Sequence, residues 1–296
     1  MPELPEVETV RRGLAPVLEG ARFAKVEQRR ADLRFPFPRN FAKRLKGRRV
    51  ERLDRRAKYL MVWLDDGEVL AMHLGMSGRF VVENGAGKSH RKILGEFVQQ
   101  AGEDGKHDHL ILTMSNGAVI RYNDARRFGY MTMIEAGKLD EHPLFQGLGI
   151  EPLSDALTAD CLAARGKGRK QPLKAFLLDQ RVLAGIGNIY ACEALHRARL
   201  MPDRPASILA LQSGAASAAA KRLAPAIRDV LEDALEAGGS SLRDYRQADG
   251  SLGYFQHRFC VYGRDGKPCL RKGCGGTIAR KVQSGRSTFY CLVCQK

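Results

Sequence analysis

The chain has 296 residues, 44% of them hydrophobic, and its 49 lysines and arginines against 33 aspartates and glutamates give a formal net charge of +16. Length and composition are those of a globular protein with two or three domains and exclude a disordered chain. Without a secretion signal or an apolar run of bilayer-spanning length, we expect a cytoplasmic protein that contacts no membrane. The charge favours a polyanionic partner, nucleic acid above all, although a merely solubilising surface would carry the same excess.

The chain begins Met1-Pro2-Glu3-Leu4-Pro5-Glu6, and removal of Met1 would leave Pro2 with a free secondary amine beside the Glu3 carboxylate. An α-amino group titrates at about pH 8, so its neutral fraction can attack an aldehyde-like carbon and form an iminium. Glu3 would be close enough to move a proton. The alternative is structural: Pro5 opens a helix, where its missing N–H costs nothing.

The first predicted elements are one helix and a set of short strands. Apolar spacing predicts a helix over residues 5–20 that ends at Gly20 and is kinked or shortened by Pro16. From about 48 to 134 the pattern is that of short antiparallel strands, which indicates a β-sandwich.

Two hairpins stand out within that region. Strands at 59–64 and 69–74 flank the turn at 65–67, and a second hairpin spans 110–122 around Asn116-Gly117. Residues 84–106 show little periodicity and predict a surface loop or insertion.

The second half of the chain changes to helical patterns. Residues 174–180 and 188–197 predict two helices separated by Gly185-Ile186-Gly187, and residues 215–237 predict a longer one. The polar, glycine-rich stretch at 238–253 predicts a loop.

The glycine turn offers backbone N–H groups at a helix N-terminus, which suits a phosphate oxygen. Basic residues that would follow a nucleic-acid backbone precede it: Arg165, Lys167, Arg169, Lys170 and Lys174. A plain loop is an equally good interpretation of the turn alone.

Cysteines cluster at the C-terminus as Cys269-x4-Cys274 and Cys291-x2-Cys294. Two such knuckles predict one structural Zn²⁺ ion in a closed tetrahedral site, because four thiolates leave no position open for water. Cys260 lies outside the pattern, and we expect it to be buried.

Between the two knuckles, two short strands are expected around Ser284-Gly285. A hairpin there would present the Arg286 guanidinium at its tip, toward a phosphate. A solvated arginine is the alternative.

Three residues suit the opening of a duplex: Met76 in the segment 73–78, and Arg126 and Phe128 in the segment 124–129. An apolar side chain on a turn can wedge between base steps while an arginine fills the vacated space. Taken singly, each is equally a core or surface residue.

Lys58 lies where a basic run enters an apolar strand. In a cleft its ammonium would neutralise a phosphate or donate a proton, and otherwise it is a surface lysine with a buried stem.

Taken together, these segments closely resemble the bacterial formamidopyrimidine-DNA glycosylases, bifunctional base-excision repair enzymes. The resemblance spans nearly the whole chain and is carried by residues 2–9, 55–60, 73–78, 107–109, 124–129, 187–190 and 285–294. The endonuclease VIII-like glycosylases also begin with a catalytic proline, but Leu4 and the Met76, Arg126 and Phe128 set look more like the formamidopyrimidine branch.

The resemblance implies an α+β fold. Its parts are an N-terminal antiparallel β-sandwich with a flanking helix over 1–135, a helix-two-turn-helix domain over 150–240, and a four-cysteine zinc-finger hairpin over 254–296. It further implies a monomer that binds damaged double-stranded DNA in the cleft between its domains.

The resemblance also implies residue roles. The Pro2 amine attacks C1′ of the damaged nucleotide, Glu3 protonates the sugar oxygen, Lys58 serves β-elimination and Arg286 helps δ-elimination. DNA contacts fall on His107, Arg126, Arg169 and Asn188. Met76, Arg126 and Phe128 would fill the gap left by a flipped base, and the loop at 240–250 would close over that base.

Two features depart from the family pattern: the first knuckle has four intervening residues where many relatives have two, and the 84–106 segment is longer than in the best-known members. Pro2 can attack only after Met1 is removed. A zinc-finger DNA-binding protein without catalysis is the alternative from another functional class.

Overall fold

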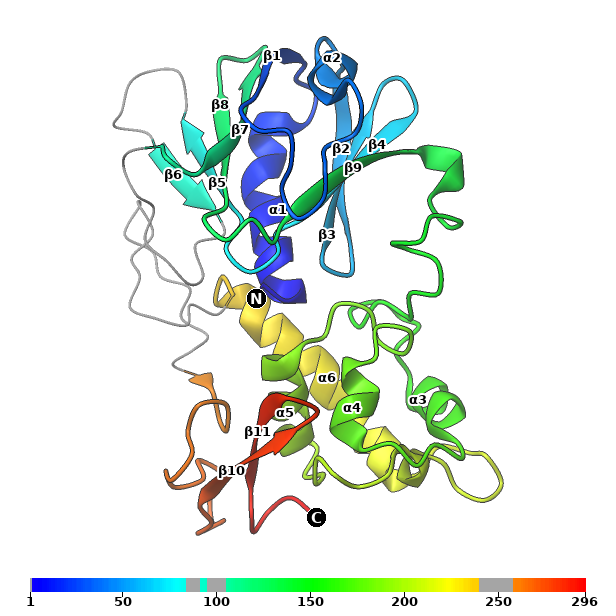
Figure 1. The fold of residues 1–296 in the computed structure, drawn as a ribbon. Coiled ribbons are helices and arrows are strands. Elements are labelled where there is room, and N and C mark those ends of the chain that lie inside the picture. Colours follow the sequence, from blue (N-terminus) through cyan, green and yellow to red (C-terminus); the bar gives the residue numbers. More distant parts are fainter. Residues whose placement is uncertain (1, 84–90, 95–104, 240–257) are drawn as a thin grey trace. The chain divides into compact units, whose positions relative to one another are not determined.

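The computed structural model describes residues 2–83, 91–94, 105–239 and 258–296 (Figure 1). The chain divides into two compact units, each described by itself. Unit 1 comprises Met1–Gln146 with Ala237–Tyr254, and unit 2 comprises Gly147–Glu236 with Phe255–Lys296. Among the described residues, no helix has the length and apolar character needed to cross a membrane.

Unit 1 is built from two antiparallel sheets. One sheet has the strand order β1-β7-β8-β5-β6 and the other the order β2-β3-β4-β9. The strands of the first sheet are β1 (Phe23–Gln28), β5 (Arg79–Glu83), β6 (Arg91–Leu94), β7 (Asp108–Met114) and β8 (Val119–Asn123). Those of the second are β2 (Val50–Arg56), β3 (Tyr59–Leu64), β4 (Glu68–His73) and β9 (Tyr130–Glu135).

Helix α1 (Leu4–Leu18) shares one hydrophobic core with both sheets. Its buried side chains recur every three or four residues at Val7, Val10, Leu14 and Leu18, which is the spacing of one helical face. The helix ends at Leu18, two residues after Pro16 and before Gly20, which agrees with the shortening expected from Pro16. Two shorter helical segments, α2 (Phe41–Leu45) and η2 (Ala136–Lys138), complete the described part of this unit.

The prediction of a loop over residues 84–106 is wrong for four of those residues. Arg91–Leu94 form strand β6, which pairs with β5 at the edge of the five-stranded sheet. The segment has only four residues, too few to show a recognisable alternation, and it depends on the β5 edge for its hydrogen bonds. Residues 84–90 and 95–104 lie outside the described part of the chain.

Unit 2 is helical and carries a small hairpin. Its helices are α3 (Ala159–Gly166), α4 (Leu173–Leu178), α5 (Asn188–Arg197), η3 (Ala206–Leu209) and α6 (Ala218–Glu236), and its strands are β10 (Ile278–Gln283) and β11 (Arg286–Cys291). Helix α5 begins and ends where the sequence predicts. The longer helix begins at Ala218, because the Ser217 hydroxyl accepts a hydrogen bond from the Ala220 N–H and caps it.

Helix α5 is the centre of unit 2. Every residue from 189 to 196 is buried, including Glu193 and His196, so the helix is enclosed on all sides. The Glu193 carboxylate accepts hydrogen bonds from three consecutive backbone N–H groups, those of Cys260, Val261 and Tyr262. These bonds fasten the segment that leads into the cysteine module. Cys260 itself is half-buried rather than buried.

Candidate functional site

Pro2 and Glu3 lie at the start of α1, and both are buried. The Glu6 carboxylate accepts a hydrogen bond of 2.9 Å from the Glu3 N–H and so fixes the backbone next to Pro2. A carboxylate at this end of a helix is also favoured by the helix dipole. Pro2 and Glu3 therefore have a defined position at the start of this helix.

Lys58 occupies the turn between β2 and β3, next to Ala57 in a left-handed conformation. Figure 1 shows this turn at the same end of unit 1 as the start of α1. The lysine is buried, and its charge acts on His73, whose pKa is lowered to about 4 by burial first, then by Lys58 and Arg34. Lys58 is thus a buried cation and not the surface lysine of the alternative interpretation.

One buried carboxylate, that of Asp124, links the segment that carries Met76 to the segment that carries Arg126 and Phe128. This side chain is 0% exposed and accepts hydrogen bonds from the Ser77 hydroxyl, the Tyr122 hydroxyl and the Gly129 N–H. The Ser77 hydroxyl in turn accepts one from the Arg126 N–H. The turn that carries Met76 is therefore tied to the turn that carries Arg126 and Phe128.

Gly75 sets how closely the two turns approach. A Cβ atom at this position would lie 2.2 Å from the Phe128 carbonyl carbon, and the residue has a φ of +62°. The contact requires glycine on both counts. Phe128 is 41% exposed, and the Arg126 guanidinium lies 4.7 Å from the centre of its ring. An exposed ring beside a cation is a suitable surface for stacking on a base.

His107 is half-buried and joins the same network through the backbone, since its carbonyl accepts a hydrogen bond from the Asp124 N–H. The neighbouring His109 ring lies against the Asp124 carbonyl, with 2.9 Å between Nε2 and the oxygen. His107 thus lies beside the Met76, Arg126 and Phe128 turns.

In unit 2 the glycine turn before α5 is braced by Gln180. Its side-chain oxygen accepts from the Gly185 N–H, and its nitrogen donates to the Ile186 carbonyl. The Gly185 N–H is therefore already bonded within the turn. Arg169 is exposed, with its Nη1 3.9 Å from an Asp179 carboxylate oxygen.

Arg286 is exposed directly after the two-residue turn Ser284-Gly285, which joins β10 to β11. Both turn residues have positive φ, the geometry that a tight hairpin favours. The guanidinium is thus displayed near the hairpin tip, as the sequence predicts.

Two side chains hold this hairpin against the helices of unit 2. The Asn188 amide donates to the Ser287 carbonyl at 2.9 Å, and the Lys174 ammonium donates to the same carbonyl at 2.9 Å and to the Thr288 hydroxyl at 2.7 Å. Lys174 is almost fully buried. The expectation that it follows a nucleic-acid backbone is therefore wrong: burial is compensated here by hydrogen bonds within the protein.

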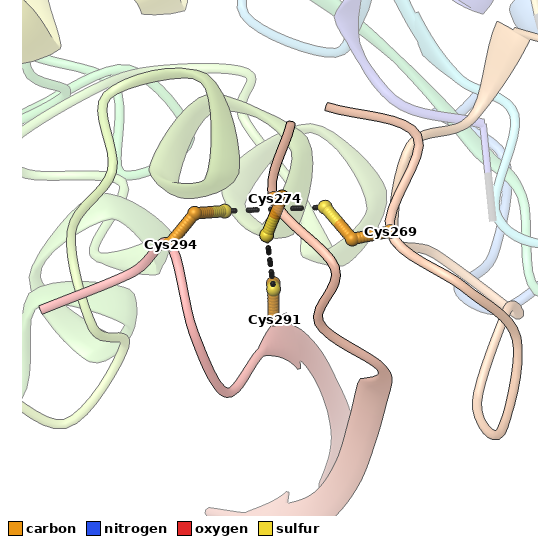
Figure 2. A group of neighbouring side chains, drawn as sticks. All are labelled: Cys269, Cys274, Cys291 and Cys294. Carbon is orange, nitrogen blue, oxygen red and sulfur yellow. Dashed lines mark hydrogen bonds between the residues drawn. The ribbon is translucent and has the colours of Figure 1, made fainter. Parts of the chain in front are cut away.

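The four cysteines converge on one point (Figure 2). The sulfur atoms of Cys269 and Cys294 are 3.9 Å apart and those of Cys274 and Cys291 are 3.5 Å apart. Zn–S bonds of about 2.3 Å in a tetrahedron place sulfur atoms about 3.8 Å apart, so the cluster fits one zinc ion. The longer first knuckle is compatible with this geometry.

Three residues that hold parts of the site in place were not predicted as site residues from the sequence: Asp124, Glu6 and Gln180. Asp124 lies within the motif that also holds Arg126 and Phe128, and this position is the local signal that connects it with the site. Glu6 stands three residues after Glu3, the spacing of a capping box. No local pattern marks Gln180, whose partners depend on the path of the turn.

Three family profiles match the chain. They are the formamidopyrimidine-DNA glycosylase N-terminal domain over residues 1–131, the formamidopyrimidine-DNA glycosylase H2TH domain over 148–246, and the zinc finger found in FPG and IleRS over 266–296.

Individual relatives match this chain over its full length. The formamidopyrimidine-DNA glycosylase of Beijerinckia indica is 59% identical over 297 residues, and that of Chelativorans sp. is 55% identical over 300, each covering 100% of both chains. The MutM (Fpg) protein of Thermus thermophilus has a TM-score of 0.79 and 41% identity, covering 99% of this chain and 98% of that one. Lactococcus lactis Fpg in complex with abasic-site DNA has a TM-score of 0.81 and 31% identity, covering 99% of both. The chain belongs to the formamidopyrimidine-DNA glycosylase family.

Proposed function

We propose that Pro2, freed by removal of Met1, is the nucleophile with which this base-excision repair glycosylase and lyase removes 8-oxoguanine and formamidopyrimidines from duplex DNA. The observation that carries the proposal is the start of α1, where the Glu6 carboxylate fixes the backbone between Pro2 and the buried Glu3. A nucleophile works best when it is held in position with a proton donor beside it, and the fixed backbone next to Glu3 supports this assignment.

In the proposed sequence of steps, the Pro2 nitrogen bonds to C1′ of the damaged nucleotide and the bond from C1′ to the base breaks. Glu3 gives a proton to the sugar ring oxygen, which opens the ring and leaves an iminium. The iminium acidifies the 2′ protons, and successive β- and δ-eliminations release the two phosphates. Lys58 assists the first elimination and Arg286 the second.

The damaged base must leave the duplex before this chemistry, at a cost of a few kcal/mol. Met76, Phe128 and Arg126 are proposed to offset that cost by filling the gap. His107, Arg169 and Asn188 are proposed to contact the DNA together with Arg126. Solved complexes of Lactococcus lactis Fpg contain abasic-site DNA and, for two mutants, Fapy-dG DNA, which supports the choice of substrate.

We also propose three domains with boundaries at 1–135, 150–240 and 254–296, a monomer, and a cytoplasmic location. The proposed loop at 240–250 that closes over the flipped base lies outside the described residues, as does Met1.

Borohydride trapping tests the function. Processed protein mixed with an 8-oxoguanine duplex and borohydride should give a covalent DNA adduct, because borohydride reduces the iminium. A Pro2→Gly variant with Met1 retained should give none, and the intact mass of each sample reports whether Met1 is present. Processed protein that cleaves no lesion and forms no adduct would leave only the non-catalytic zinc-finger interpretation.

A further inference from the structure

A histidine side chain lies next to the cysteine cluster in unit 2: that of His196, near the end of α5. Its Nε2 lies 3.4 Å from the Cys269 sulfur, and the ring is buried. The other ring nitrogen, Nδ1, is also buried and has no hydrogen-bonding partner among the described residues. A neutral imidazole carries one N–H, and a buried N–H is rarely left without an acceptor. The proton therefore belongs on Nε2, where the sulfur accepts it.

Arg271, inside the first knuckle, meets the same end of α5. Its Nη2 donates to the His196 carbonyl at 2.7 Å and lies 3.4 Å from the Arg197 carbonyl. A cation at the C-terminus of a helix is favoured by the helix dipole, and here it adds to the hydrogen bond that the His196 carbonyl accepts from the Arg199 N–H. The contact joins the knuckle to the helix that begins at Asn188.

The surroundings of the cluster are strongly cationic. A surface hollow of about 490 Å³ reaches Cys274 and Cys294 and is lined by five basic residues: Arg199, Arg222, Arg271, Lys272 and Lys296. Four thiolates and one Zn²⁺ ion carry a net charge of −2, which nearby cations and N–H donors stabilise. The charge of the hollow thus complements the charge that the loaded site would have.

We propose that His196 and Arg271 form an outer shell of the zinc site, in which His196 Nε2–H donates to the Cys269 thiolate and Arg271 fixes the first knuckle to α5 while compensating the site's negative charge. Both are positioning residues, since neither binds the metal. The Asn188 amide at the start of α5 donates to the Ser287 carbonyl of the hairpin. The finger is therefore bonded to both ends of helix α5. The inference depends on the zinc site and not on the proposed catalytic roles.

Zinc release from the full-length, zinc-loaded protein tests the proposal, with excess chelator and a coloured zinc indicator. His196→Phe retains a ring but loses the donor, and it should release zinc roughly tenfold faster, the usual scale for loss of an outer-shell partner. His196→Gln retains an N–H donor and should stay closer to the unsubstituted protein. Arg271→Gln should also accelerate release. The matched control is Arg280→Gln, because Arg280 is exposed on β10, donates to the Ser287 hydroxyl and does not line the hollow, so its release rate should be unchanged.

Equal release rates for His196→Phe, Arg271→Gln and the unsubstituted protein would overturn the proposal, as would a His196→Gln variant that is as fast as His196→Phe. A second measurement uses the unsubstituted protein, so it does not depend on whether a variant folds. Correlation of ring nitrogens with ring protons in the ¹⁵N-labelled, zinc-loaded protein should show the His196 proton on Nε2. A proton on Nδ1 with a bare Nε2 would contradict the hydrogen bond to Cys269.

Discussion

Units 1 and 2 each display an arginine on a short turn, but they hold it in place by different means. Arg126 lies on a turn anchored by the buried Asp124 carboxylate beside a large sandwich core. Arg286 lies on a two-stranded hairpin whose hydrophobic cluster is small and includes the cysteines of the metal site. A small module cannot bury enough apolar surface to order itself and needs a metal or other cross-link. The two turns should therefore fail under different perturbations.

Zinc removal should have the largest effect, and it should be confined to unit 2. Structural zinc sites contribute roughly 10 kcal/mol or more to folding, so chelation should unfold the finger. Hydrogen exchange should then show loss of amide protection in β10 and β11 while the strands of unit 1 stay protected. Protection of residues 278–291 that survives complete zinc removal would contradict the difference between the units.

The corresponding change in unit 1 is Asp124→Ala. It leaves three donors, on Ser77, Tyr122 and Gly129, without their buried acceptor, and each such loss costs about 1–3 kcal/mol. We expect the free energy of unfolding to fall by about 5 kcal/mol in urea titrations. Asp65→Ala is the control, because Asp65 pairs with Arg22 at the surface and its removal should cost below about 1 kcal/mol. Similar losses in the two variants would refute the anchoring role of Asp124.

Gly75→Ala tests the close approach of the two turns in unit 1. The new methyl group would meet the Phe128 backbone and adopt a positive φ, for a combined cost of about 4 kcal/mol. Gly117→Ala has a positive φ as well but open space around its Cβ, so it should cost only about 1 kcal/mol. Thermal unfolding of both variants measures the difference, and equal losses would show that the approach at Phe128 carries no constraint.

The smallest expected effect is on pH dependence, through His73. Its Nδ1 accepts a hydrogen bond from the Gly75 N–H, and its pKa in the folded protein is lowered to about 4 by burial, Lys58 and Arg34. An unfolded histidine titrates near 6.5, so the unfolded chain binds the proton more tightly. The contribution of His73 to the free energy of unfolding is therefore complete above about pH 6.5. As the pH falls toward 4, about 3 kcal/mol of this contribution is lost.

His73→Asn separates this effect from general acid denaturation. The asparagine oxygen can accept the same N–H but does not titrate. Urea unfolding at pH 7 and pH 4.5 should show a smaller pH-dependent loss in the variant than in the unsubstituted protein. An unchanged loss would assign the acid sensitivity to other groups.

Features with a local pattern were predicted well from the sequence. Helix α5, the hairpin around Asn116-Gly117 and the four-cysteine cluster each depend on residues close in the chain. The braces of the site depend on distant partners: Ser77 and Asp124 are 47 residues apart, and Lys174 and Ser287 are 113 apart. Strand β6 likewise needs the edge of β5. Such pairings follow from the folded topology, and no periodicity in one segment encodes them.

Mapping the trapped DNA adduct to a residue tests the central claim most directly. After borohydride reduction on an 8-oxoguanine duplex, the protein is digested and the modified peptide is sequenced by mass spectrometry. We predict that the sugar remnant is bonded to the nitrogen of Pro2, at the start of a peptide that lacks Met1. An adduct on Lys58 or another lysine, with Pro2 unmodified, would contradict the assignment of Pro2 as the nucleophile.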